Sequence, residues 1–184
     1  MPLALLFREA NMEGIDIISE LMTISAITAP KSKGENYVQT LTLKGDMLKK
    51  LAEAMRAFGE KNQKKDFDRD ANNIDKSESV LLIGLKKATV LGLNCNACGF
   101  ETCANLMKHP QNEETEFKGP VCMFRLLDLG IALGSAVKTA GMLNVDNRIM
   151  YRVGVVARQM GLVDWDIAMG IPMSVSGKNI FFDR

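Results

Sequence analysis

The chain has 184 residues, of which 47% are hydrophobic and 24% charged, and its formal net charge is +1 at pH 7. This composition is typical of a globular protein, and no basic run indicates nucleic acid or an anionic membrane as a partner. The longest strongly apolar run, residues 129–137, is far shorter than the roughly 20 residues of a membrane-spanning helix, and the opening residues lack the pattern of a signal peptide. We therefore expect a cytoplasmic protein with a single domain over residues 1–184.

The first third of the chain predicts two helices and a strand. Apolar residues recur at helical spacing over residues 15–29, and Pro30 ends that helix. Residues 37–43 alternate threonine with leucine, which is typical of a strand with one face in water. Asp46 can cap a second helix over residues 47–61, which has one apolar face.

A charged segment and a buried strand follow. Residues 61–77 are rich in charged side chains and poor in apolar ones, so we expect a solvated loop there. Residues 80–85 are continuously apolar, as in a central strand that is covered on both faces. The next segment therefore begins just beyond a buried strand.

That segment holds all the cysteines of the chain, Cys95, Cys98, Cys103 and Cys122, in the pattern C-x2-C-x4-C-x18-C. Disulfide frameworks are normal in small secreted chains, but a chain of this size has enough apolar sequence to form a core without them. Thiolates are soft anionic ligands, and four of them complete the shell of a zinc ion or of an iron-sulfur cluster. We therefore expect a metal site on these four residues.

The spacing favours iron-sulfur over zinc. A zinc ribbon usually carries two C-x2-C pairs around one small ion, whereas here only Cys95 and Cys98 form such a pair. Three cysteines on one loop with a remote fourth suit a cubane, whose corners lie several ångströms apart. A [4Fe-4S] cluster is the first hypothesis, and zinc or unliganded thiols are the alternatives.

Residues next to the cysteines favour thiolates. Gly99 can adopt positive φ, which lets backbone N–H groups approach the sulfurs. Residues 101–108 predict a short helix with Cys103 in its first turn, where free N–H groups and the positive end of the helix dipole stabilise a thiolate. Pro120 would stiffen the approach to Cys122.

The remainder of the chain predicts two helices and a strand. The most apolar helix covers residues 123–143, and its small residues would let another backbone pack closely, so it is a core helix first and a candidate homodimer surface second. Asp146 is expected to cap a helix over residues 147–160. Residues 165–169 are expected to form the last strand.

These elements predict an α+β domain with a small antiparallel or mixed sheet packed by helices. We expect residues 92–122 to form a cysteine-rich insertion within it. His109 is the only histidine, and neither a serine-histidine-acid set nor a glycine-rich nucleotide loop is found. Hydrolysis and phosphoryl transfer are therefore disfavoured.

The cysteine motif also resembles that of known iron-sulfur proteins. The string Asn-Cys-x-x-Cys-Gly-Phe-x-x-Cys over residues 94–103, with a remote cysteine after Gly-Pro, is similar to the [4Fe-4S] module in the B subunit of Rnf electron-transport complexes and in the corrinoid iron-sulfur protein. Those modules usually follow the last cysteine with Pro and Gly, whereas Met123 and Phe124 stand here. The resemblance implies a cluster held by Cys95, Cys98, Cys103 and Cys122.

A larger part of the chain resembles an uncharacterised bacterial and archaeal family described only as ferredoxin-domain proteins. The similarity lies in Thr-Ala-Pro-Lys at 28–31, in NVDNRIMYR at 144–152 and in GIPMSVSGKN at 170–179. It extends over nearly the whole chain. The resemblance implies an iron-sulfur protein without naming its reaction.

A fainter similarity is to the flavin-dependent nitroreductase fold. A helix that ends in Ala-Pro ahead of the first strand, and Gly-Ile-Pro at 170–172, are similar to elements of that fold. Nitroreductases hold flavin mononucleotide (FMN) with an Arg-x-Ser-x-Arg element before the first long helix, and only Arg8 lies near that position here. The resemblance implies the fold and leaves flavin binding in doubt.

Three functions follow as hypotheses. The first is an anaerobic-type redox protein that binds one [4Fe-4S] cluster and transfers electrons to an unidentified redox partner or second cofactor. The second is a scaffold or interaction protein in which the four thiolates hold structural zinc. The third is an FMN-dependent oxidoreductase of the nitroreductase type.

Overall fold

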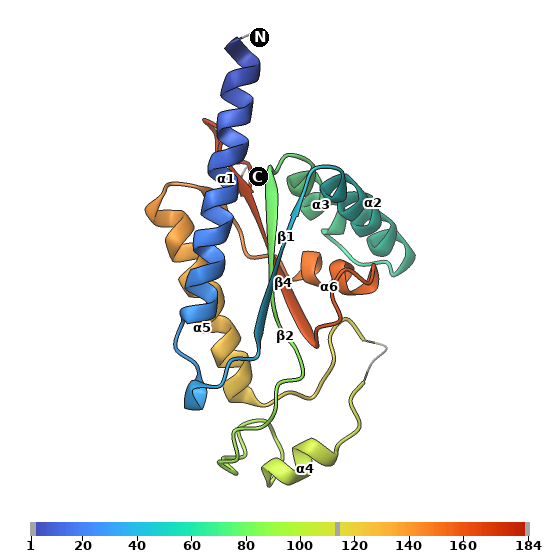
Figure 1. Cartoon of the computed structure of the whole chain (residues 1–184). Coiled ribbons are helices and arrows are strands. Elements are labelled where there is room, and N and C mark those ends of the chain that lie inside the picture. The colour runs from blue at the N-terminus through green and yellow to red at the C-terminus, as the bar shows by residue number, and fades with distance from the viewer. Residues whose placement is uncertain (1–2, 113–114, 183–184) are drawn as a thin grey trace.

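The computed structural model describes the backbone of residues 3–112 and 115–182, and the side chains within those ranges from residue 13 onward. Within them lies an antiparallel sheet in the order β1 (Val38–Lys44), β2 (Ser79–Leu85), β4 (Ile167–Ser174) and β3 (Asp146–Asn147). The helices α1 (Leu3–Thr28) and α5 (Met123–Met142) cover one face of the sheet, and α2 (Asp46–Lys61), α3 (Phe67–Asp75) and α6 (Tyr151–Gln159) cover the other (Figure 1). This arrangement confirms the predicted α+β fold with a small sheet packed by helices.

The strand β2 joins the two cores, because it is buried along its whole length. Alternate side chains of a strand point to opposite faces of the sheet. Leu81 and Ile83 accordingly lie in the core under α1 and α5, whereas Val80 and Leu82 lie in the core under α2, α3 and α6. The continuously apolar run of residues 80–85 is therefore explained by burial on both faces, as predicted.

The helix α6 lies directly on β4 at a glycine. A Cβ atom built on Gly154 would be 1.7 Å from the carbonyl oxygen of Ala168. Glycine is therefore required at this position for close packing of the helix backbone on the strand.

The predicted solvated loop over residues 61–77 is wrong in its centre, where the structure has the helix α3. Phe67, Ala71 and Ile74 are buried at helical spacing, and the Phe67 ring lies 4.8 Å from that of Phe58 on α2. These three residues form a short apolar stripe, which the charged residues between them make hard to recognise in the sequence. Burial of that stripe against α2 favours the helix over a loop.

Two predicted boundaries near the end of the chain are also wrong. Residues 146–147 do not begin a helix, because they pair with Met173 and Ser174 as β3, and α6 begins at Tyr151. The last strand is not 165–169 but Ile167–Ser174. Pro172 is paired with Val80 of β2. Gly170, two residues earlier, directs its N–H and C=O away from β2 and toward Met150, and Pro172 has the same orientation in the strand. The missing N–H of Pro172 therefore removes no hydrogen bond to β2.

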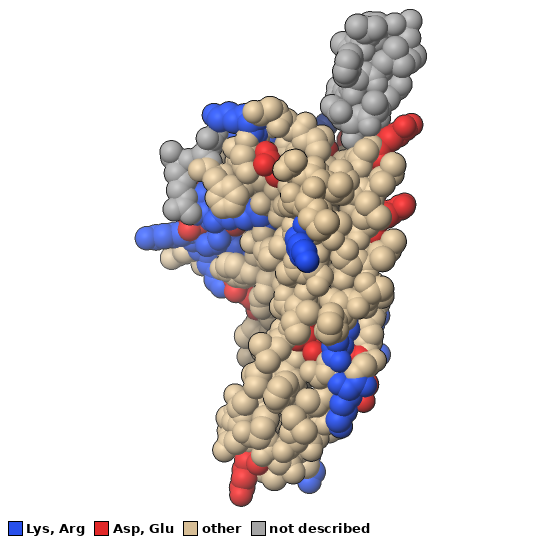
Figure 2. All heavy atoms as spheres, turned by 90° about the vertical axis from the view of Figure 1, so that its left-hand side faces the viewer, with Lys and Arg blue, Asp and Glu red and all other residues tan. Residues whose placement is uncertain are grey.

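The outer surface of α1 and α5 carries few charged side chains, as Figure 2 shows. Eight large apolar side chains of these helices are exposed: Ile17, Leu21, Ile24, Ile27, Leu126, Leu127, Ile131 and Met142. We call these eight residues the α1–α5 face. Even so, none of the helices in the described part of the chain is long and apolar enough to cross a membrane.

Candidate metal centre

The segment between β2 and α5 leaves the sheet and lies past its end, at the bottom of Figure 1. It contains the cysteine loop and the short helix α4 (Cys103–Lys108). It then returns to α5, whose N-cap is Cys122. The end of a buried strand and the start of a core helix thus hold the two ends of this segment.

All four cysteines line one small cavity of about 290 Å³, a volume that includes space open to solvent. Cys95 is exposed, Cys98 and Cys103 are half-buried, and Cys122 is buried; all four are free thiols. Among the described residues, no three His, Cys, Asp or Glu side chains converge closely enough to hold a single metal ion. The four residues therefore surround a cavity, with Cys122 at its inner end.

Asn94 and Cys103 connect the two ends of the cysteine loop. The Asn94 backbone N–H donates to the Cys103 sulfur at 3.4 Å, and the Cys103 N–H donates to the Asn94 side-chain oxygen at 2.9 Å. Asn94, Asn96 and Gly99 all have positive φ, which asparagine and glycine adopt more readily than other residues. The local sequence therefore allows a tight loop that turns the Asn94 N–H toward the Cys103 sulfur.

The helix α4 begins at Cys103. Thr102 is its N-cap, and the Thr102 hydroxyl accepts a hydrogen bond from the Asn105 N–H at 3.2 Å. The helix starts two residues later than predicted, but Cys103 lies in its first turn as expected.

An apolar shell surrounds the inner side of the cavity. Leu91, Leu106 and Cys122 are buried together, and Val90, Cys98, Phe100 and Phe124 pack against them. This shell buries Cys122 and leaves Cys95 at the open side.

Arg125 anchors Cys122 from the first turn of α5. Its side chain has 0% exposure, and its backbone N–H donates to the Cys122 carbonyl at 3.0 Å. The guanidinium donates to the Thr89 carbonyl at 2.9 Å and to Asp128 at 3.1 Å, and it also pairs with Glu35. A buried charge is tolerated only when it is paired in this way.

The same network reaches the loop after α1. The Asp128 carboxylate accepts hydrogen bonds from the N–H and the hydroxyl of Ser32, both at 2.8 Å. The Tyr37 ring lies 4.7 Å from the guanidinium carbon of Arg125. The base of the cysteine segment is therefore fixed to α5 and to the loop between α1 and β1.

Lys31, in the Ala-Pro-Lys element, points back onto α1. Its ammonium donates to the carbonyls of Ala26, Ile27 and Ala29 at 2.6 to 2.8 Å. Burial lowers the pKa of Lys31, and the nearby Asp128 carboxylate opposes part of that shift. This lysine caps the helix carbonyls.

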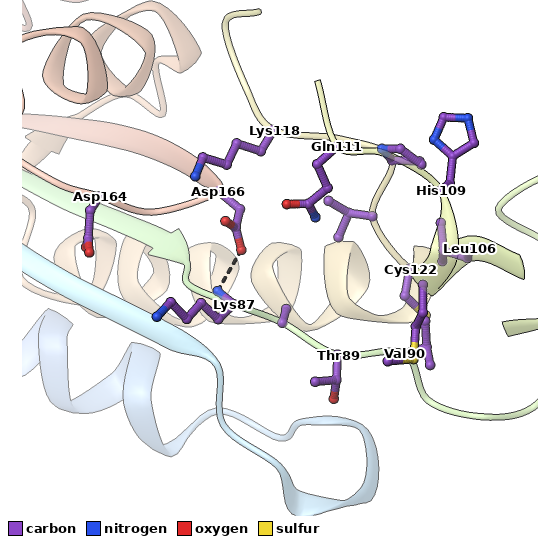
Figure 3. Close-up of a pocket in the computed structure, with 14 residues that line it drawn as sticks. Lys87, Thr89, Val90, Leu106, His109, Gln111, Lys118, Cys122, Asp164 and Asp166 are labelled. Carbon is purple, nitrogen blue, oxygen red and sulfur yellow. Dashed lines mark hydrogen bonds between the residues drawn. The ribbon is translucent and has the colours of Figure 1, made fainter. Parts of the chain in front are cut away.

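A second, larger cavity adjoins the first. It measures about 1070 Å³ with the space open to solvent, and Cys122 lines both cavities. Figure 3 shows Lys87 and Thr89 along one side of it and Gln111 and Lys118 along the other, with Asp166 between Lys118 and Lys87.

His109, the only histidine, also lines the larger cavity. Its Nδ1 lies 2.8 Å from the Pro110 carbonyl oxygen, and its ring meets the edge of Phe100 at 5.2 Å. No acid or hydroxyl partner among the described residues is hydrogen-bonded to it. The contacts of His109 are therefore with the backbone and with an aromatic ring.

Comparison with known proteins identifies the family. Residues 118–184 match the family described as "Uncharacterized protein containing a ferredoxin domain (DUF2148)". An uncharacterised protein of Archaeoglobus fulgidus is 48% identical over 177 residues, which cover 96% of this chain and 95% of the relative. The chain belongs to this family of ferredoxin-domain proteins. The family match includes Cys122, whereas the similarity to the archaeal relative extends over nearly the whole chain.

Solved structures show which fold the ferredoxin-domain protein has. Nitroreductase CinD from Lactococcus lactis matches 91% of this chain and 84% of its own, with a TM-score of 0.59 and 13% identity. A nitroreductase from Desulfitobacterium hafniense matches 89% and 79%, with a TM-score of 0.56 and 10% identity. The oxidoreductase YcnD from Bacillus subtilis matches 88% of this chain, which spans only 58% of that structure, with a TM-score of 0.52 and 17% identity. The fainter resemblance in the sequence is thus confirmed at the level of the fold.

Sequence reasoning missed the residues that support the site. The cysteines were found because thiol spacing is a local signal. Arg125, Asp128 and Asp166 carry no such local signal. Their partners lie far away in the sequence, as Glu35 does from Arg125, and no local pattern marks such pairs.

Proposed function

We propose that the protein binds one [4Fe-4S] cluster on Cys95, Cys98, Cys103 and Cys122 and carries electrons to a redox partner. The observation that supports this most is that four cysteines spread over 28 positions of the sequence line a single cavity. Membership in a ferredoxin-domain family supports the same proposal. Such a cluster, when bound, accepts and donates one electron at a time.

The chemistry of the donor set fits a cluster. The four thiols line one cavity. A zinc ribbon usually holds its ion with two C-x2-C pairs, whereas this chain has one such pair and two single cysteines. The spacing therefore supports iron-sulfur over the structural zinc of the alternative hypothesis.

The residues around the cavity would affect the reduction potential of the cluster and the access of a partner to it. The Asn94 N–H already donates to the Cys103 sulfur, and such bonds stabilise the more negative state of a cluster. The apolar shell on the Cys122 side excludes water, whereas the exposed Cys95 gives a partner access. Electrons would therefore pass most directly through the Cys95 side.

The test is anaerobic purification followed by a visible spectrum and metal analysis of the same sample. Broad absorption at about 400 nm, about four irons per chain and bleaching by dithionite are expected. One zinc per chain with no visible absorption would overturn the proposal and leave a structural site.

A bound flavin is the second candidate, because the fold is that of proteins such as the D. hafniense nitroreductase, which is described with bound FMN. Two observations weigh against it here. In the sequence, only Arg8 lies near the position of the Arg-x-Ser-x-Arg element that holds FMN in nitroreductases. In the structure, the Lys31 ammonium donates to helix carbonyls rather than being open to a phosphate. Titration of the purified protein with FMN, followed by flavin fluorescence, tests this candidate. Stoichiometric quenching would establish a flavoprotein.

The α1–α5 face supports a homodimer. Its eight side chains are each 37% to 75% exposed and together present on the order of 700 Å² of surface, close to the roughly 800 Å² per partner of a standard interface. Because few charges lie on it (Figure 2), two copies can meet without placing like charges together.

Sedimentation equilibrium should show a dimer, and the double variant Ile24→Glu with Ile131→Glu should be a monomer. Met107→Glu, which changes an exposed side chain on α4, is the control. A monomeric wild-type protein at micromolar concentration would contradict the dimer.

A further inference from the structure

The larger cavity is built on one buried carboxylate. Asp166 is 8% exposed, and three segments meet at it. Its N–H donates to the Leu85 carbonyl at 2.8 Å, and its carbonyl accepts from the Lys118 N–H at 2.9 Å. Its carboxylate accepts from the Lys87 N–H at 2.6 Å, the bond drawn in Figure 3. The end of β2, the start of β4 and the segment that returns to Cys122 are thereby held together.

Asp166 fixes Lys87 in an unusual backbone conformation. Lys87 has φ of 52°, a region that glycine adopts easily and that costs other residues about 1 kcal/mol or more. Glycine at this position would avoid the cost of the positive φ, but the cavity would then lack the Lys87 ammonium. Lys87 thus lines the cavity despite its unfavourable backbone conformation.

Charged side chains lie at the polar end of the cavity. Lys87 and Lys118 line it together with Asp164 and Asp166, and the ammonium of Lys86, which is outside the lining, lies 2.7 Å from Asp164. The pKa of Asp164 is lowered, chiefly by the hydrogen bond from Lys86 and by the Lys86 charge, and least by the charge of Lys87. Both carboxylates thus have partners, whereas no described residue is hydrogen-bonded to the Lys87 ammonium.

The opposite end of the cavity is apolar and reaches the metal centre. Val90, Leu106 and Val121 line it beside Cys122, which also lines the smaller cavity. A ligand that fills the space must therefore combine an anionic group at one end with an apolar body at the other.

We propose that this cavity binds a small organic carboxylate, with its carboxylate at Lys87 and its apolar body against Val121 and Cys122. The bound acid would lie next to one thiol of the metal centre, as a redox substrate or a regulator of that centre. That role rests on the proposed function, whereas binding of the acid does not.

Isothermal titration with benzoate, at low ionic strength and on the full chain, tests the proposal. We expect saturable binding, with the neutral benzamide bound at least tenfold more weakly. Lys87→Gln should weaken benzoate binding about tenfold, which corresponds to about 1.4 kcal/mol. Val121→Phe, which fills the apolar end, should weaken benzoate and benzamide alike.

The control is Lys108→Gln, which removes a lysine charge from the adjacent helix α4 without changing a residue of the cavity wall. Its affinity for benzoate should equal that of the wild type. Absence of saturable benzoate binding to the wild type, or equal affinity in Lys87→Gln, would overturn the proposal. The titration measures binding alone, so a protein found to hold zinc instead of iron still tests the cavity, and the metal analysis separately decides the proposed function.

Discussion

Asn94 and Cys103 close the cysteine loop reciprocally, because each donates its backbone N–H to the side chain of the other. The bond to the Asn94 side chain can be removed without changing a cysteine. Glycine keeps the positive φ of residue 94 available, so Asn94→Gly isolates that one contact.

We expect Asn94→Gly to lose bound metal faster than the wild type, because the first N–H of α4 loses its acceptor and the loop opens more often. The cost of one such hydrogen bond is about 1 kcal/mol, which corresponds to roughly a fivefold change in an opening equilibrium. The measurement is the decay of absorbance at about 400 nm in air. Asn96→Gly, at a neighbouring position of positive φ whose side chain has no recorded hydrogen bond, should decay like the wild type. Equal decay of all three proteins would show that the contact is unimportant.

Cys122 and Cys95 should behave differently when each is changed to serine. Both variants are expected to lose the cluster, because each removes one of four ligands. In the metal-free proteins, however, Cys122→Ser should cost about 1 to 3 kcal/mol, since its hydroxyl would be buried among Leu91, Leu106 and Phe124. Cys95→Ser should change stability by about 0.5 kcal/mol or less, because that residue is exposed. Iron content and urea denaturation of each variant provide the two measurements. A full complement of iron in either variant would contradict the ligand assignment.

Arg125→Met should be among the most destabilising single changes in the protein. It leaves Asp128 and Glu35 without their cation, and loss of one partner of a buried ion pair costs about 3 to 5 kcal/mol. Arg56→Met is the matched control, because Arg56 pairs with Asp75 while both are 38% exposed, and such pairs contribute about 1 kcal/mol or less. Urea denaturation followed by circular dichroism measures both. Similar losses in the two variants would contradict the role given to Arg125.

The elements that a local sequence pattern marks could be predicted. The buried strand β2 and the long helix α5 were found within one residue of their observed starts, because apolar residues mark each of them continuously. The same reasoning failed at α3, whose three apolar residues are separated by charged ones. It also failed at β3, where two polar residues form a strand only because β4 lies beside them.

The same distinction between local and long-range signals applies to the candidate metal centre. That the four cysteines lie together could be predicted, because the spacing of cysteines is a local signal. The residues that support it could not, because Arg125 and Asp166 are identified by burial and by partners from other segments. A single arginine in a helix carries no sign in the sequence that it is buried. Contacts between segments are therefore what the structure adds.

Gly154 and Gly134 give opposite predictions for the same substitution. Gly154→Ala would place a Cβ atom 1.7 Å from the Ala168 carbonyl oxygen, so α6 must move off β4, at a cost of about 2 kcal/mol or more. Gly134 lies in α5 with no atom within 4 Å of its Cβ position, and alanine there should stabilise the helix by about 0.5 to 1 kcal/mol. Trp165, the only tryptophan, is 6% exposed and reports unfolding by fluorescence in urea. Because both changes add one methyl group inside a helix, propensity alone predicts a gain at both positions. A stabilised Gly154→Ala variant would therefore contradict the observed packing of α6 on the sheet.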